Sequence, residues 1–588
     1  MSSVEQQNAS KLLPFWVRAF VRARGIGLVI AAFVIGIISG GLVALMGRIV
    51  QGLHTLLFGL AAEQRLSAAE DVAFWRILAV PILGGAVLAL LASYARRFSG
   101  RLADVIEANA LFGGRLSLKG SLLLTLQTIA SCGFGASVGL EAGYAQISAA
   151  VASRLGLALA ARRADLRLLV ACGAGGAIAA AFGAPLAGAF YGFEVVLGTY
   201  TVGALAPVAT SALTASLIAR NFEESTFLVK PGSLSVVGFA DLAHILAIGV
   251  ICGLAGIVLM LAVAGSETTF KRLRVPVAWR TVIGGLLIGA MGLVSPQVMG
   301  SGHGAMVVDL VASLSPFALI SIIVLKGAAS AVSLGSGFRG GLFYASLLIG
   351  ALIGRLYADL GFEINPDIAF DPDLAALTGM AALGTGVIGA PITMTALALE
   401  TTGNFSITVA ALIAAVVSSV IVRELFGYSF ATWRFHLRGE AIRGPHDIGW
   451  MRELSVKNLM RADVRTAPLD QTLREARQKF PLGALKQIAA IDEKERYAGL
   501  VSLDDLHMAP PEQGGDELAT IVRQKDRMLL PWMSVREALD LFEKNEADAL
   551  IVVDHEATRR IVGLLTEAHA LRRYGEELER QNPDNILR

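Results

Sequence analysis

Apolar residues dominate the chain from about Gly27 to Trp433, whereas polar and charged residues return from about Glu440 onward. A helix needs roughly 20 apolar residues to cross a hydrocarbon core. Four runs come close to this length without interruption: Leu28–Met46, Leu78–Ala95, Leu246–Ala264 and Ile407–Val422. The pattern predicts a polytopic all-α membrane domain over residues 27–440, followed by a soluble module.

Four further apolar runs are short or are broken by Gly, Pro or a charge: Leu169–Phe190, Phe317–Leu334, Gly341–Leu356 and Leu374–Leu399. They fit two interpretations, either ordinary spans or half-helices that end inside the membrane. Non-helical backbone survives at that depth only where it is buried in protein or lines a wet cavity. Half-helices would therefore mark a functional site.

The membrane region contains an internal repeat. "CGAGGAIAAAFGAPLAGAFYGFE" (Cys172–Glu194) and "GMAALGTGVIGAPITMTALALE" (Gly379–Glu400) share small residues, then Gly-Ala-Pro, then an apolar helix that ends in Glu. Each lies downstream of a glycine-rich break, at Gly133–Gly143 and Gly335–Gly341. Matching interruptions indicate two halves, about 27–220 and 238–433, with a binding site at their interface.

The tail also repeats. In each copy a turn leads to an amphipathic helix and two strands, and a polar turn then opens another helix. Strands predicted at Ala489–Ile491 and Ala549–Val553 alternate with helical patterns, which is typical of α/β units. We therefore expect a small paired domain with copies at 454–512 and 522–580.

Composition narrows the function. Hydrophobic residues make up 54% and charged residues 17%, against about 25% charged in an average soluble domain. A net charge of +2 is too balanced to indicate a nucleic-acid partner. The three cysteines lie in apolar stretches and have no metal or disulfide spacing. Basic residues flank both ends of the apolar region: Lys11, Arg18, Arg22, Arg24, Arg434, Arg438 and Arg443. This flanking predicts that both termini, including a segment at 1–26, are cytoplasmic.

One carboxylate, Glu141, is the lone charged residue between Lys119 and Arg154. A carboxylate inside a membrane is costly and is a functional hypothesis by default. The start of a half-helix presents unpaired N–H groups and a positive dipole end, so several such starts bind an anion without a fixed cation. We expect Gly139–Gly143 and Gly340–Phe343 to form this site, with Glu141 as a tethered competitor of the anion. The alternative is a structural pairing of Glu141 with an arginine.

No catalytic triad, zinc spacing or phosphate loop is present, and "GSGFRGG" lacks the Lys-Ser/Thr of a phosphate loop. A membrane enzyme with Glu141 and Glu194 as an acid/base pair is the weakest hypothesis, because nucleophile and metal ligands are missing. Glu194 is better interpreted as a brace for a helix end. We therefore expect no enzymatic activity and no metal site.

These motifs resemble the CLC family of chloride channels and proton-coupled chloride transporters. "GLEAG" at Gly139–Gly143 is similar to the family's gate motif, and "GSGFRGGLFYASLLIGALIG" from Gly335 to its second pore motif. In the tail, "SVKNLM" and "GLVSLDD" resemble CBS domains. The resemblance implies an inverted repeat of broken helices with a tandem CBS pair. It also implies a homodimer in the inner (plasma) membrane, chloride as the permeant ion and no required cofactor.

The resemblance also implies which residues act, with Glu141 as the gate. The residues implied to surround the anion are Gly100, Gly139, Leu140, Ala142, Gly143, Gly341, Leu342, Phe343 and Tyr428. Gly100 stands where the family has a serine. The pore tyrosine of the family falls on Tyr428 in one alignment and on Ala431 in another.

Further departures bear on mechanism and selectivity. Gly143 and Ala345 stand where the family has prolines, so nitrate or fluoride are alternatives to chloride. Val195 occupies the position of the acid that relays protons in many exchangers, and it follows Glu194. Valine carries no proton, which favours a gated chloride channel. The alternative is a chloride/proton antiporter in which Glu194 or a water wire replaces the relay.

For the CBS pair, the resemblance implies an adenine-nucleotide sensor for ATP, ADP or AMP. Ser502 and Asp505 in "SLDD" would bind ribose and phosphate, and Thr566 matches in the second copy. His569 replaces the usual acid there. The alternative is a ligand-free domain that stabilises a dimer.

Overall fold

The protein was analysed as a computed structural model, which describes residues 25–69, 71–98, 103–222, 237–239, 241–312, 314–365, 370–436, 455–481, 483 and 487–581. The chain divides into two compact units, residues 1–447 and 448–588. The predictions that concern residues 1–24, Gly100 and the linker around residues 440 to 454 lie outside the described residues.

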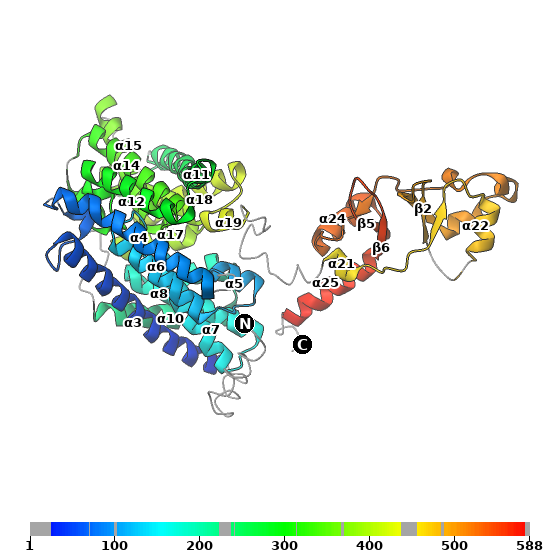
Figure 1. Ribbon diagram of the computed structural model, residues 1–588, viewed down its shortest axis with the longest axis horizontal. Helices are drawn as coiled ribbons and strands as arrows, with labels where there is room; N and C mark the ends of the chain where they lie inside the picture. The colour runs from blue at the N-terminus through cyan, green and yellow to red at the C-terminus, as the bar shows by residue number, and fades with distance from the viewer. Residues whose placement is uncertain are drawn as a thin grey trace. The chain divides into compact units, whose positions relative to one another are not determined.

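The first unit is helical (Figure 1). Its first half holds α3 (Gly25–Phe58), α4 (Phe74–Phe98), α5 (Val105–Leu111), α6 (Leu118–Gly133), α7 (Glu141–Ala158), α8 (Arg163–Phe182), α9 (Pro185–Tyr191), the π-helical turn η2 (Gly192–Leu197) and α10 (Val202–Arg220). Its second half holds α11 (Leu242–Arg272), α12 (Val277–Val294), α13 (His303–Val311), α14 (Pro316–Ser336), α15 (Phe343–Ile364), α16 (Pro372–Ile388), α17 (Pro391–Thr402), α18 (Phe405–Leu425) and α19 (Phe430–His436).

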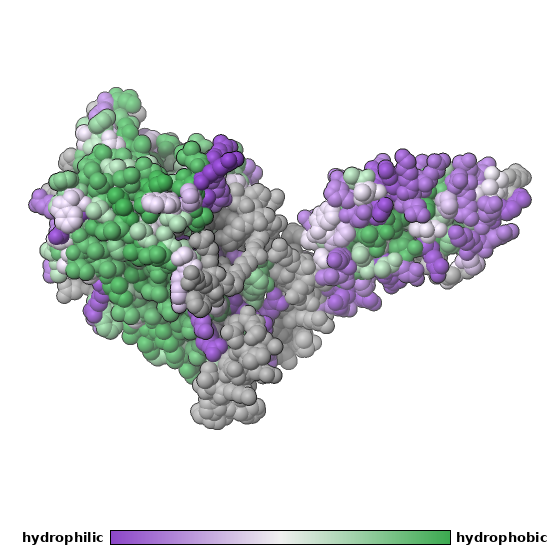
Figure 2. All heavy atoms as spheres, in the orientation of Figure 1, coloured by the Kyte–Doolittle hydropathy of each residue, from purple (hydrophilic) through white to green (hydrophobic). Residues whose placement is uncertain are grey.

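Among the described residues, nine helices are long and apolar enough to cross a membrane. The four uninterrupted runs of the sequence fall inside α3, α4, α11 and α18. Apolar side chains cover the visible face of this unit (Figure 2). Among its residues, Leu205, Val258 and Phe317 are each more than half exposed. An apolar surface of this extent fits contact with lipid, which confirms a multi-pass membrane domain.

The Gly-Ala-Pro motifs break their helices at equivalent places. α8 is followed by Gly183 with φ +64° and α16 is followed by Gly389 with φ +81°, the left-handed conformation that glycine adopts at helix ends. In each case the proline then occupies the first position of the next helix, where its missing N–H costs nothing. The predicted repeat of broken helices is therefore confirmed.

The structure decides between the two interpretations of one segment and adds helices that the sequence did not indicate. Phe317–Leu334 is an ordinary span and not a half-helix, because α14 runs without a break through it. Helices α10 and α12 were not recognised as separate elements, since their alanines and glycines hide the periodicity. Those small residues serve close packing between helices: a β-carbon at Gly350 would overlap the backbone of Gly379.

The second unit is a pair of α/β modules with a mostly polar surface (Figure 2). The first contains α21 (Val456–Leu459), β1 (Thr466–Pro468), α22 (Leu473–Lys479), β2 (Gln487–Ile491), β3 (Tyr497–Ser502) and α23 (Leu503–Met508). The second contains β4 (Met528–Leu529), α24 (Val535–Asn545), β5 (Ala549–Val553), β6 (Ile561–Thr566) and α25 (Glu567–Gln581).

The two modules have the same topology. Their sheets have the orders β1-β2-β3 and β4-β5-β6, each with a parallel and then an antiparallel pair. Thr472 and Ser534 cap the equivalent helices α22 and α24 with the same capping box. Side chains from both sheets, among them Tyr497 and Ile551, form one shared apolar cluster.

Candidate functional site

The two glycine-rich breaks meet inside the membrane unit. The first lies between α6 and α7, and the second lies between α14 and α15. The Gly139 N–H donates to the Gly341 carbonyl at 2.9 Å, and the Gly341 N–H donates to the Gly139 carbonyl at 3.0 Å. This antiparallel bridge joins the two halves and brings the starts of α7 and α15 together.

Glu141 lies at this junction as the first residue of α7 and is 4% exposed. Its carboxylate accepts hydrogen bonds from its own backbone N–H and from that of Tyr344. A β-carbon at Gly139 would overlap this carboxylate, and one at Gly341 would lie 3.4 Å from Oε2. The absence of side chains at both glycines therefore makes room for the acid.

No ion pair joins Glu141 to a lysine or arginine among the residues that the structure describes. Its Oε2 atom is buried there without a hydrogen-bond partner. The carboxylate therefore lies where backbone amides, and not a cation, stabilise negative charge.

The start of α15 supplies those amides. Leu342 and Phe343 are buried, and the first hydrogen bond within the helix runs from the Ser346 N–H to the Leu342 carbonyl. The N–H groups before Ser346 have no acceptor in their own helix, as at any helix start. The Tyr344 N–H donates to the Glu141 carboxylate. The acid therefore binds one of several backbone donors that could also bind an anion.

Serines hold the two breaks against each other. Ser131 Oγ accepts from the Arg339 N–H at 2.9 Å, and Ser333 Oγ accepts from the Ser137 N–H at 3.1 Å. The hydroxyls of Ser137 and Ser330 lie 3.1 Å apart. These serines were missed in the sequence, because isolated serines in apolar helices carry no signal of their partners.

A second structural feature is a cavity of about 170 Å³, here called the Tyr428 cavity. Its lining comes from α5, η2, α16, α18 and the segment before α19, and includes Ile106, Glu194, Val195, Ile388 and Tyr428. The structure thus brings Val195 and Tyr428 to one space although they are far apart in the chain.

Glu194 and Glu400 form reciprocal caps between the halves. The Glu194 carboxylate accepts from the Ile392 N–H at 3.0 Å and from the Thr393 N–H at 2.8 Å and hydroxyl at 2.6 Å. Glu400 accepts from the N–H groups of Leu186 at 2.8 Å and Ala187 at 2.9 Å. Each acid satisfies the unpaired start of the other half's Gly-Ala-Pro helix.

Residues 83–423 match the family described as voltage gated chloride channel, and residues 456–512 and 533–576 match the CBS domain. The chain belongs to the CLC family. It is similar to "Voltage-gated ClC-type chloride channel ClcB" of Escherichia coli, with 33% identity over 67% of this chain and 95% of the relative. It is also 33% identical to "Putative chloride channel protein ClcB-like" of Ralstonia nicotianae, over 61% of this chain and 85% of that protein.

Two solved CLC structures share the fold. A slow cyanobacterial Cl⁻/H⁺ antiporter aligns with a TM-score of 0.61 and 23% identity, over 70% of this chain and 97% of its own. A eukaryotic CLC transporter aligns with a TM-score of 0.60 and 19% identity, over 92% of this chain and 97% of its own. The sequence assignment to the CLC family with CBS domains is confirmed.

The residues that the CLC resemblance singled out fall into two groups. The structure gathers Gly139, Leu140, Glu141, Ala142, Gly143, Gly341, Leu342 and Phe343 at the junction of α7 and α15. Tyr428 lines the cavity instead, where its ring packs against Phe426 and Trp433 at centroid distances of 6.4 and 5.5 Å. Ala431, the alternative, packs in an apolar cluster with Val195.

In the CBS pair, Ser502 and Thr566 occupy equivalent strand ends, immediately before α23 and α25. The Asp505 carboxylate is paired with Arg523 at 2.9 Å. His569 lies among Arg461, Arg572 and Arg573, so the second module offers positive charge where the first offers an acid.

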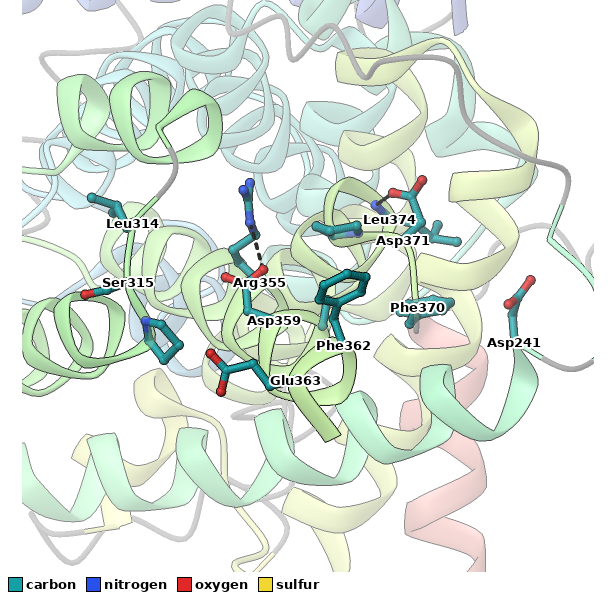
Figure 3. A pocket seen from close by; sticks show the side chains of 13 residues that line it. Asp241, Leu314, Ser315, Arg355, Asp359, Phe362, Glu363, Phe370, Asp371 and Leu374 are labelled. Carbon is teal, nitrogen blue, oxygen red and sulfur yellow. Dashed lines mark hydrogen bonds and ion pairs between the residues drawn. The ribbon is translucent and has the colours of Figure 1, made fainter. Parts of the chain in front are cut away.

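Another pocket has a volume of about 760 Å³ and lies at the ends of α11, α14, α15 and α16 (Figure 3). It contains none of the predicted pore residues. Its lining includes Asp241, Asp359, Glu363 and Asp371, with Arg355 paired to Asp359 at 3.5 Å. An excess of acids disfavours an anion, so this pocket is not the anion site.

Proposed function

We propose that the protein is a gated chloride channel whose gate is Glu141. The proposal rests on one observation, the Gly139–Gly341 bridge that places the buried Glu141 carboxylate at the starts of α7 and α15. We further propose a homodimer in the inner membrane with both termini in the cytoplasm. Basic residues flanking the apolar region support that orientation.

Partial charges on backbone amides explain how an anion both binds and leaves. A buried lysine or arginine would hold chloride too tightly, whereas helix-start dipoles favour the ion without trapping it. The negative head of Glu141 competes for the same donors. Protonation removes this competition, and so does displacement by an entering chloride ion.

The contacts of Glu194 and the apolar side chain of Val195 favour a channel over an antiporter. Val195 is buried in an apolar cluster with Ile106 and Ala390. Glu194 accepts three hydrogen bonds at the start of α17, which hold it in place as a cap. The alternative, a chloride/proton antiporter, is supported by the fold it shares with a Cl⁻/H⁺ antiporter. The name of the ClcB relative supports the channel.

Coupled flux separates the two functions. Purified protein in vesicles loaded with chloride is diluted into low chloride while external chloride and pH are recorded together. A channel releases chloride without moving protons against their gradient. Uphill proton movement driven by chloride would replace the channel by the antiporter, and absence of any anion flux would contradict both.

For the tail we propose an adenine-nucleotide sensor built on Ser502, Asp505 and Thr566. Titration of the full chain in detergent with ATP, ADP and AMP is expected to release heat. Asp505→Asn is expected to weaken binding, because it removes the charge that would accept from ribose hydroxyls. Absence of heat at millimolar nucleotide would leave a ligand-free scaffold.

A further inference from the structure

Tyr191 is an aromatic residue at the junction that the sequence did not single out. It is the last residue of α9 and leads into η2. Its ring centroid lies 6.3 Å from that of Phe343, the first residue of α15. Gly188, one turn earlier, approaches the backbone of Ala179 so closely that a β-carbon would overlap it. α9 is therefore held directly against α8, and the position of Tyr191 is fixed.

Tyr191 lies between the Tyr428 cavity and the gate. It packs with Ile106, Val195 and Ile388, three residues that also line the cavity. The Glu141 carboxylate is close enough to interact electrostatically with the Tyr191 phenol, as is Asp104. The same side chain therefore touches the walls of the cavity on one side and approaches Glu141 on the other.

The phenol of Tyr191 has a hydroxyl that can donate one hydrogen bond and accept others. Among the described residues, no group donates a hydrogen bond to its hydroxyl or accepts one from it. The Tyr191 side chain is partly buried. Its helix packs on α8, and its ring lies beside that of Phe343. A tyrosine that is enclosed by protein normally finds a partner for its hydroxyl. The Tyr191 hydroxyl has no such partner among the described residues, although its ring packs against Phe343 and the residues around Val195.

The two tyrosine positions considered from the sequence do not meet these conditions. Ala431 belongs to the same cluster as Tyr191 but has no hydroxyl. Tyr428 lies at the cavity wall, where its ring packs against Phe426 and Trp433. Tyr191 instead packs its ring against Phe343, the first residue of α15.

We propose that the Tyr191 hydroxyl donates a hydrogen bond to the permeant anion, opposite the amides of Leu342 and Phe343. This inference rests on the proposed function. The amides approach the ion from the start of α15, and the phenol supplies a donor from α9 in the other half of the repeat. A phenol adds no fixed charge, so it strengthens binding of a small, hydrated anion without trapping it.

Chloride binding and flux test this assignment. Isothermal titration of chloride-depleted full-length protein with chloride is combined with chloride efflux from vesicles. Tyr191→Phe keeps the ring against Phe343 and removes only the hydroxyl, so the variant is expected to fold. Loss of one hydrogen bond to a charged partner is expected to weaken chloride binding about tenfold. Discrimination between chloride and the larger nitrate is expected to fall with it.

Two further variants make the test specific. Tyr94→Phe alters a tyrosine that is 56% exposed on α4 and is expected to match the wild type. Tyr428→Phe tests the competing position: a loss confined to Tyr428→Phe overturns the proposal. If Tyr191→Phe binds chloride with wild-type affinity and still conducts it, the role of Tyr191 is overturned, whereas the proposed channel function is not. A wild-type protein that neither binds nor conducts chloride contradicts the channel itself.

Discussion

At the residue scale, one buried carboxylate explains more of this protein than any other side chain. Glu141 is 4% exposed, and its hydrogen-bond donors are backbone amides at two helix starts. Burial of a carboxylate normally demands a cation or neutralisation. Here the same donors would serve a chloride ion, so the acid and the ion are alternatives at one place. That equivalence is the physical basis of the proposed gate.

Replacing Glu141 by glutamine tests the gate. Glu141→Gln has the shape of the acid but never carries its charge, so chloride efflux is expected to lose most of its pH dependence. In the wild type, efflux is expected to rise as pH falls, because protonation removes the competing charge. Efflux from vesicles between pH 5 and pH 8 measures both. Glu363→Gln, an exposed acid at the end of α15, is the matched control. Unchanged pH dependence in Glu141→Gln would remove Glu141 from the gate.

His569 makes the stability of the tail depend on pH. Partial burial lowers the pKa of His569, and the positive charges of Arg572, Arg461 and Arg573 lower it further. The folded state therefore takes up this proton less readily than the unfolded chain, whose histidines titrate near 6.5. The free energy of unfolding is expected to be constant above that pH and to fall below it. Thermal unfolding of the tail at pH 7.5 and 5.5 measures this loss of stability. In His569→Gln the loss of stability between the two pH values is expected to be smaller than in the wild type. An equal loss in both proteins would contradict the role of His569.

At the element scale, breaks in helices create both the site and the need for its supports. Each Gly-Ala-Pro helix begins inside the protein with unpaired N–H groups. Glu400 satisfies the start of α9, and Glu194 satisfies the start of α17. Because each acid comes from the other half, the two halves of the repeat hold each other. Tyr191 and the Tyr428 cavity depend on the placement of these helices.

Loss of one reciprocal cap is expected to destabilise the membrane unit. Glu400 accepts from the Leu186 and Ala187 N–H groups with its two carboxylate oxygens. Glu400→Gln keeps one neutral acceptor and places an NH2 donor where the second oxygen was, so one hydrogen bond is weakened and the other is lost, at a cost of about 1–3 kcal/mol. Thermal unfolding in detergent should show a lower midpoint for this variant. Glu267→Gln breaks an exposed ion pair with Lys271 and is the control, since such pairs contribute little. Equal midpoints for Glu400→Gln and the wild type would show that the cap is dispensable.

At the scale of the whole molecule, the chain consists of a conducting unit and a separate tail. Every residue of the junction and of the Tyr428 cavity lies in residues 1–447. The tail has its own two cores and its own topology. We therefore predict that anion conduction requires no residue of the tail.

Removing the tail tests this division. A chain that ends after Asp447 is expected to conduct chloride with the anion selectivity of the full protein, because no pore residue is lost. Any effect of ATP on flux is expected to disappear with residues 448–588. Efflux from vesicles with chloride or nitrate inside provides the measurement. Changed selectivity in a folded, truncated protein would assign part of the anion path to the tail.

Local patterns in the sequence determined where helices cross the membrane and where they stop. Uninterrupted apolar runs predicted α3, α4, α11 and α18, and the breaks before Glu141 and Phe343 follow from glycine-rich segments. Gly-Ala-Pro predicted the starts of α9 and α17. These are properties of short segments, because a missing N–H or a left-handed glycine ends a helix regardless of what lies beside it.

Only the tertiary structure decided what each break faces. The partner of Gly139 is Gly341, and the partner of Glu194 is the start of α17. The rings beside Phe343 are those of Phe182 and Tyr191. Residues so far apart in the chain meet because helices with small side chains pack closely, and that packing depends on the whole repeat. A pattern within one segment shows that its backbone donors need a partner, whereas the identity of that partner is set by the neighbouring helices.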